Sequence, residues 1–323
     1  MNGRELPCTS FALFMVMLAL STWVLAAPAA TTRAPARGKI PPGMSAVEAD
    51  TLPRYYAKDR EDTREWLKGK PTSYLATILR RDFDTKTSLV VGSDPGADVR
   101  IEDPGIKPKH LQVSVVGDSF HVETLDPAAR FKVKDAETTS ATVGPSSIQV
   151  ARFTLRLSHQ RFPAIIVFDP KSPRYKLYKG IQYFPPDLSY HIVATFRPNP
   201  KADTTIILST RGNRRRAVRA GWFDFKVRGK ACTLEASRLL EPGVGEKDMD
   251  VFFTDATTGK ESYSVGRYLG PQAREDGTYV LDFNMCYNPA CAYSEHYNCP
   301  IPPRANHLNV AIRAGEMDSH YMH

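Results

Sequence analysis

Residues 278–316 read TYVLDFNMCYNPACAYSEHYNCPIPPRANHLNVAIRAGE, and residues 255–270 read DATTGKESYSVGRYLG. Polar groups and cysteines are concentrated there between short apolar stretches. The pattern over residues 279–283 predicts a strand that presents Asp282 and Asn284 on one face, because side chains alternate along a strand. Backbone ladders alone cannot hold the Pro-rich loop that follows, since proline has no N–H. A covalent bridge or a side-chain network must therefore fix this loop.

Eight polar residues of these two segments form the candidate functional set. They are Asp255, Tyr263, Arg267, Asp282, Asn284, Asn288, Asn306 and Glu316. As a site, carboxylates beside an arginine could bind a polar ligand or perform acid–base chemistry, because paired carboxylates can have their pKa values pushed apart. As structure, the same groups would form a satisfied network, with Arg267 pairing Asp282 or Asp255 and the asparagines capping loop backbone. The sequence leaves both interpretations open.

The motifs of these segments resemble a bacterial family catalogued as domain of unknown function 1684. The matching pieces are Asp255-Ala256-Thr257, Gly259, Tyr263, Gly266-Arg267-Tyr268-Leu269, Leu281-Asp282-Phe283-Asn284, Tyr287-Asn288-Pro289, Cys291-Ala292-Tyr293, Cys299-Pro300, Pro302-Pro303, Asn306 and Ala314-Gly315-Glu316. The chain departs from the pattern at Ala290, where the family usually has proline, and at Cys286. Further matches between residues 168 and 180 extend the resemblance over most of the mature chain. The resemblance implies a fold family but no named reaction.

The first 26 residues have the pattern of a secretory signal peptide. Arg4 precedes an apolar run from Phe11 to Leu25, and small residues end the run at Ala26. The run is short for a membrane span, and no charge cluster follows it. We therefore expect an exported protein, periplasmic or secreted, with no transmembrane anchor in the mature chain, which would begin near Ala27.

Four cysteines follow the predicted signal peptide, and an even number of cysteines in an exported protein favours disulfides. We expect a Cys291–Cys299 bridge first and a Cys232–Cys286 bridge second. The alternative is zinc, because Cys286, Cys291, His296 and Cys299 have the spacing C-x4-C-x4-H-x2-C. This spacing matches no common zinc motif. We therefore expect no metal and no cofactor.

Residues 90–125, VVGSDPGADVRIEDPGIKPKHLQVSVVGDSFHVETL, resemble a forkhead-associated (FHA) domain, a β-sandwich that reads phosphothreonine on its loops. The arginine usual after the first glycine is replaced by Ser93, and the usual Ser-Arg pair before the histidine is replaced by Lys107-Pro108. Charge-assisted phosphate donors are therefore missing. Ser93, Lys107, Lys109 and His110 could still hold an anion. The alternative is that His110 has a structural role.

The remaining pattern predicts a mainly β chain: an FHA-like β-sandwich followed by a second β-rich domain, with one N-terminal helix. Ser45 can cap this helix, which ends near Gly69 and carries no chemical motif. Expected segments are a signal peptide (1–26), a flexible linker (27–44), the helix with the sandwich (45–159), the second domain with its Cys/Pro loop (160–316) and a disordered tail (317–323).

The formal net charge of +8 owes much to an arginine cluster around a Gly212-Asn213 turn. The cluster comprises Arg211, Arg214, Arg215, Arg216 and Arg219. It could attract anions or simply be a solvated hairpin. Aromatic residues are not interleaved with the arginines as a nucleic-acid groove requires, so we expect no nucleic-acid partner.

Catalytic motifs give little support for an enzyme. The sequence contains no G-x-S-x-G elbow, no H-E-x-x-H and no dinucleotide fingerprint. Ser189 and His191 are close in sequence, as are Ser294 and His296, but triads are spatial arrangements. We expect a non-catalytic envelope protein that binds a polar ligand or a protein partner.

The alternative is a hydrolase-like enzyme that uses Asp255, Asp282 or Glu316 with Arg267. It would require two of these carboxylates within about 5–10 Å in one concave pocket.

Overall fold

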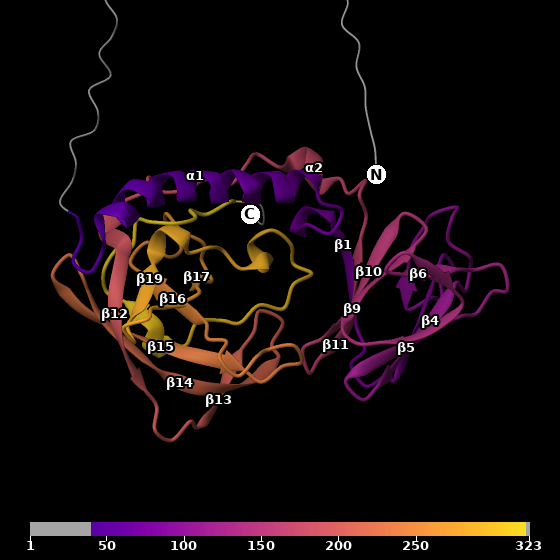
Figure 1. Cartoon of the computed structure of the whole chain (residues 1–323). Coiled ribbons are helices and arrows are strands. Elements are labelled where there is room, and N and C mark those ends of the chain that lie inside the picture. Colours follow the sequence, from indigo (N-terminus) through magenta and orange to yellow (C-terminus); the bar gives the residue numbers. More distant parts are fainter. Residues whose placement is uncertain (1–39, 321–323) are drawn as a thin grey trace, which may run out of the picture. The chain divides into compact units, whose positions relative to one another are not determined.

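The computed structural model describes residues 40–320 (Figure 1). The predicted signal peptide and linker residues 27–39 lie outside the described residues. Strands dominate the described part of the chain, so the predicted mainly β class is confirmed. Between residues 40 and 320, no helix has the length and apolarity needed to cross a membrane.

Helix α1 (Ala46–Gly69) is the predicted N-terminal helix. It begins with a capping box in which the Ser45 side chain accepts from the Glu48 amide and Glu48 accepts from the Ser45 amide. These contacts satisfy two of the N–H groups that a helix start leaves without partners. Only Tyr56 and Leu67 of α1 are buried. The helix is therefore held through a few contacts and not through a broad apolar face.

Two antiparallel sheets form the sandwich. The first has the strand order β1-β11-β10-β9-β6-β7 and the second β3-β2-β4-β5-β8, in which β3 pairs parallel to β2. The strands of the first sheet are β1 (Thr77–Asp82), β6 (Phe131–Val133), β7 (Ala136–Thr138), β9 (Ser146–Val150), β10 (Phe153–His159) and β11 (Pro163–Phe168). Those of the second are β2 (Ser88–Gly92), β3 (Val99–Arg100), β4 (Leu111–Val116), β5 (Ser119–Thr124) and β8 (Ser140–Val143).

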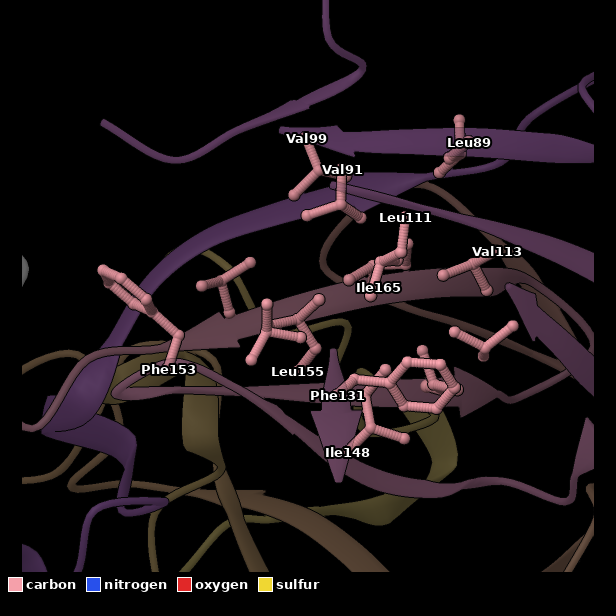
Figure 2. Packing of buried hydrophobic residues seen from close by; sticks show 14 of the residues in the cluster. Leu89, Val91, Val99, Leu111, Val113, Phe131, Ile148, Phe153, Leu155 and Ile165 are labelled. Atoms are coloured by element: carbon pink, nitrogen blue, oxygen red, sulfur yellow. The ribbon is translucent and has the colours of Figure 1, made fainter. Parts of the chain in front are cut away.

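Aliphatic and aromatic side chains from both sheets fill the space between them. Figure 2 shows Val91 and Leu111 of the second sheet facing Leu155 and Ile165 of the first. All four side chains are inaccessible to solvent. Burial of such side chains stabilises a fold by roughly 1.5–3 kcal/mol each. This core accounts for the predicted sandwich.

The predicted domain boundary at residue 160 needs correction. β11 lies beyond that boundary, yet it pairs with β10 and with β1 in the first sheet of the sandwich. Its residues 164–168 are all buried. The β-sandwich therefore extends to Phe168, because the last strand completes the sheet that the first strand begins.

The second β region contains two sheets, one ordered β13-β14-β12-β19-β18 with β15 paired to β14, the other β17-β16-β20. Their strands are β12 (His191–Pro198), β13 (Thr204–Leu208), β14 (Arg214–Val227), β15 (Lys230–Leu239), β16 (Val251–Asp255), β17 (Arg267–Leu269), β18 (Gln272–Ala273), β19 (Tyr279–Asp282) and β20 (His307–Leu308). Short helical turns complete the chain: η1 (Tyr74–Ala76), α2 (Arg174–Leu177), η2 (Leu188–Tyr190), η3 (Phe283–Met285), η4 (Ala290–Ala292) and η5 (Arg304–Asn306).

The tight turn at Arg228-Gly229 sets the register of β14 and β15. The turn at Gly229 pairs Phe225 with Cys232 and brings Phe223 opposite Leu234. Leu234 is fully buried, whereas Cys232 is only half-buried. The Cys232 side chain therefore reaches the edge of the core and not its centre.

Two local expectations prove wrong. Strand β19 ends at Asp282, whose side chain accepts from the Asn284 amide and caps the turn η3. Alternation therefore stops before Asn284. The predicted disordered tail is ordered as far as it is described, because the Met317 amide donates to Gln182 and the Asp318 amide to Glu261.

Three arginines of the cluster around Gly212 are ion-paired. Arg215 is buried and binds Glu241. Arg219 contacts Asp203 and Glu235, and Arg211 contacts Asp82. The cluster is thus in large part internally neutralised.

Tyr56→Phe should lower the free energy of unfolding by about 1–3 kcal/mol, because it removes a donor from a buried carboxylate. The fully buried Tyr56 hydroxyl donates to Asp282 Oδ2 at 2.6 Å and attaches α1 to β19. Urea unfolding monitored by circular dichroism measures the change. Tyr55→Phe is the matched control, since Tyr55 is 53% exposed. Equal stability of the two variants would contradict this role of Tyr56.

Candidate functional site

A cavity of about 490 Å³ lies between α1 and the C-terminal half of the second β region. Its wall is mainly aromatic and polar, with residues from α1, from the segment of η3 and the loop after it, and from Glu316 near the C-terminus. The lining residues are Asp59, Thr63, Trp66, Leu67, Tyr74, Tyr183, Gly270, Gln272, Asn284, Met285, Cys286, Tyr287, Asn288, Tyr293 and Glu316. Three of the eight candidate residues thus meet here: Asn284, Asn288 and Glu316.

Gly315 places Glu316 in the cavity wall. The φ angle of Gly315 is +73°, and a Cβ atom at this position would lie 2.4 Å from the Cys286 carbonyl oxygen. Only glycine fits such a close approach in the left-handed region. This close approach allows the Glu316 amide to donate to the Cys286 carbonyl. The backbone of Glu316 also forms an isolated antiparallel β-bridge with Tyr183.

The Glu316 carboxyl group is almost completely buried, at 5% exposure. Its Oε2 accepts from the Asn288 amide at 2.8 Å and from the Tyr293 hydroxyl at 3.0 Å. Burial raises the pKa of Glu316 to about 7, and nearby Asp59 adds to the rise, while these two hydrogen bonds and Arg267 oppose it. The group is therefore close to half-ionised at neutral pH.

Asn288 has hydrogen-bonding capacity that the described residues do not use. Its Nδ2 donates to the Met317 carbonyl at 2.7 Å, but the buried Oδ1 has no partner among residues 40–320. Buried polar atoms are almost always paired, so an exception in a cavity wall requires explanation. An acceptor is available here for a donor from outside the chain.

Asp282 lies in a second network behind the cavity. Its Oδ2 accepts from Tyr56 and from His191 Nδ1 at 2.8 Å, and its Oδ1 accepts from the backbone and side-chain amides of Asn284. A carboxylate only accepts, so His191 carries its proton on Nδ1. The Nε2 atom of His191 is buried and has no partner within the described chain. Four donors saturate Asp282, which does not line the cavity.

Arg267 and Asp255 form the pair that the structural interpretation predicts. Arg267 Nη2 lies 3.4 Å from Asp255 Oδ1, and its guanidinium donates to the carbonyls of Ile312, Ala314 and Glu316. Asp255 accepts from the Ile312 amide at 2.6 Å. Arg267 and Asp255 therefore fasten the C-terminal segment and are not available to a ligand.

The last two candidates also serve the backbone. Asn306 accepts from the Glu235 amide and donates to the carbonyls of Glu235 and Phe252, joining β15 to β16. The Tyr263 hydroxyl donates to the Cys291 carbonyl at 3.3 Å. Neither residue lines the cavity.

All four cysteines of the described chain are free thiols, so neither predicted disulfide is formed. Cys291 and Cys299 are neighbours, since the Cys291 amide donates to the Cys299 sulfur at 3.2 Å. Cys286 lies in the cavity wall, and burial raises the pKa of its thiol to about 12. Between residues 40 and 320, no three His, Cys, Asp or Glu side chains are grouped to hold a metal ion.

His110 of the sandwich bonds only neighbouring backbone in the contacts that the structure records. Its Nδ1 accepts from the Lys107 amide at 3.1 Å, and its Nε2 lies 3.0 Å from the Arg130 carbonyl. Both ring nitrogens therefore hold loops together, which favours the structural interpretation of this histidine.

Sequence reasoning missed most of the aromatic wall and all of the residues that α1 contributes. Asp59, Thr63, Trp66 and Leu67 occupy one side of the helix at spacings of three and four, so they share one face. The position of Trp66 on that face is the one signal that pointed to a partner surface. Helix α1, in which the sequence showed no chemical motif, therefore contributes four residues to the cavity wall.

The pH dependence of stability tests Glu316. Folded Glu316 holds its proton up to a pKa of about 7, whereas an unfolded glutamate releases it near 4.5. The native state therefore binds more protons between these values, and rising pH destabilises it through this window. Glu316→Gln should remove a loss on the order of 2–3 kcal/mol between pH 5 and pH 8. Urea unfolding at several pH values measures it.

Glu261→Gln provides the control of opposite sign. The Arg313 side chain lowers the pKa of Glu261, so this carboxylate stabilises the fold at higher pH. Glu261→Gln should therefore lower the free energy of unfolding at higher pH. Parallel pH profiles of the wild type and Glu316→Gln would contradict the raised pKa of Glu316.

Comparisons with known proteins found matches to parts of the chain. Residues 176–317 match the family model described as "Protein of unknown function (DUF1684)". An NMR structure of an uncharacterized protein from Haloarcula marismortui is 31% identical and covers 48% of this chain and 85% of its own, with a TM-score of 0.38. A search of curated proteins gave no match.

Two FHA structures are also similar to part of the chain. The FhaA FHA domain, solved in complex with the intracellular domain of another protein, is 16% identical and covers 27% of this chain and 96% of its own, with a TM-score of 0.20. A structure from work on phosphothreonine-dependent FHA domain interactions is 15% identical and covers 28% and 94%, with a TM-score of 0.20. Residues 176–317 of the chain are thus similar to the family described as protein of unknown function DUF1684.

Proposed function

We propose that this protein is a non-catalytic binding protein whose cavity beneath α1 takes a small polar organic molecule. The observation that carries the proposal is the cavity itself: an aromatic wall with a buried carboxyl group, Glu316, and an unpartnered acceptor, Asn288 Oδ1. Its volume of about 490 Å³ falls within the range of roughly 300–1,000 Å³ for small-molecule sites. Apolar walls with a few fixed polar groups are typical of such sites.

The distribution of the carboxylates supports binding over hydrolysis. Of Asp255, Asp282 and Glu316, only Glu316 lines this cavity. Asp255 is held by Arg267 and the Ile312 amide, and Asp282 by four donors. A pair of carboxylates that works on a substrate needs both groups at the substrate. The hydrolase-like alternative, which uses two of Asp255, Asp282 and Glu316, lacks this support, because the second carboxyl group of the cavity wall belongs to Asp59.

A cavity-filling substitution tests the proposal. Thr63→Trp should abolish the binding of small polar fragments, because the indole would occupy the space into which Thr63 faces. Ligand-observed NMR with a fragment mixture measures binding, and circular dichroism checks the fold. Thr51→Trp is the matched control on the exposed side of the same helix and should leave binding intact. Fragment binding that survives Thr63→Trp would place the ligand elsewhere.

The proposal includes export, on the strength of the signal-like pattern in residues 1–26. N-terminal sequencing of protein recovered from outside the cytoplasm should find a start within a few residues of Ala27. An intact Met1 on cytoplasmic material would refute export. In an oxidising compartment the neighbouring thiols of Cys291 and Cys299 would close into the expected bridge, and non-reducing peptide mapping of the same material would then recover these two cysteines linked.

A further inference from the structure

We propose that the ligand of the cavity beneath α1 is a cationic amine that carries at least two N–H groups on an apolar body. This inference rests on the proposed function, because it names the chemical class of the molecule that the cavity binds. Three independent features of the wall lead to it: its charge, its unused acceptors and its aromatic rings.

The charge of the lining is negative in a chain that is positive overall. Asp59 and Glu316 line the cavity, and none of the lining residues, all of which lie within residues 40–320, is a lysine, arginine or histidine. Three guanidinium groups lie close to the lining, although none of them belongs to a lining residue. Arg60 and Arg64 lie over the Tyr183 ring, and Arg267 is bound to Asp255 and to backbone carbonyls. The carboxyl groups of Asp59 and Glu316 in the lining itself attract a cation.

Two acceptors in this wall are left for a ligand. Asn288 is 2% exposed, and its Oδ1 has no partner in the described part of the chain. Both hydrogen bonds to the Glu316 carboxyl group reach Oε2, so Oε1 remains for the ligand. Two acceptors in one cavity wall favour a ligand with two donors, and an ammonium group supplies up to three. Charge-assisted hydrogen bonds of this kind are also the stronger ones.

Aromatic rings surround these acceptors. Tyr74 stacks on Tyr293 with centroids 5.5 Å apart, and Trp66 meets the edge of Tyr74 at 4.8 Å. Tyr287 completes the aromatic part of the lining together with Tyr183, over whose ring Arg60 and Arg64 already lie. The negative faces of such rings attract ammonium groups, and their area suits an apolar body. The rings and the carboxylates thus favour the same cation.

Binding of a cation should release a proton near neutral pH. An ionised Glu316 pairs with the amine, whereas the protonated form does not, and burial raises the pKa of Glu316 to about 7. Affinity for the amine should therefore rise between pH 6 and pH 8. At the higher pH, Glu316 is already ionised in the free protein, so no proton has to be released on binding. The other titratable or charged groups that act on Glu316 are Asp59, Arg267, Tyr74, Tyr183, Tyr287, Tyr293 and Cys286.

The experiment uses matched probes on the whole protein. Each set consists of a primary amine, the corresponding alcohol and the corresponding carboxylic acid on one phenylalkyl body, with bodies of three lengths. Isothermal titration at pH 7.5 should find the best amine at least tenfold tighter than its alcohol, with no binding of its acid. Glu316→Gln should remove this preference while it keeps alcohol binding, and Glu261→Gln should leave the preference intact.

Isothermal titrations repeated in buffers of different ionisation enthalpy measure how many protons are released on binding. Near pH 6.5 the wild type should release a fraction of a proton on binding the amine, and Glu316→Gln should release none. If alcohols or acids bind at a site that Thr63→Trp blocks while amines bind no better, the amine inference is overturned and the proposed function stands. If no probe of any class binds at millimolar concentration, both are overturned.

Discussion

The C-terminal half of this protein contains a loop with few ladder hydrogen bonds, and the buried peptide groups of this loop need other hydrogen-bond partners. Between Met285 and Glu316 the described chain forms only one two-residue strand, β20, so its N–H and C=O groups need other partners. Side chains provide them: Arg267 binds three carbonyls of the last segment, and Asn306 binds the backbone of two strands. An unpaired buried peptide group costs about as much as a lost hydrogen bond. The density of conspicuous polar residues in this region follows from that requirement.

The same chemistry therefore has two uses in one set of residues. Asp255 and Asp282 accept several hydrogen bonds from protein donors, as buried carboxylates must when they remain charged. Glu316 accepts two and faces a cavity. In sequence nothing marks one of these three acids as different in role from the others. What separates them is the number of donors that the folded chain brings to each.

Local features of the fold were predictable, and distant juxtapositions were not. The capping box at Ser45, the turn at Gly229 and the alternating strands depend on neighbours within a few residues, which a sequence displays directly. The meeting of Asp59 with Glu316 depends on how α1 docks on the second β region. The extent of the sandwich was misjudged for a similar reason, because β11 pairs with β1, which lies far earlier in the chain. Of the candidate site, the acid and two asparagines were found and the aromatic wall was not.

Asn284 connects the two networks beneath α1. This amide lines the cavity, and it also donates to Asp282, the carboxylate that holds Tyr56 and with it the helix. A substitution in the Asp282 network and a substitution in the cavity wall both affect Asn284. Their effects on the free energy of unfolding should therefore not be additive. Variation at the helix anchor and variation in the cavity wall are then linked by epistasis: a change accepted in one background is rejected in another. A chain that altered this cavity wall would have to adjust the attachment of its helix as well.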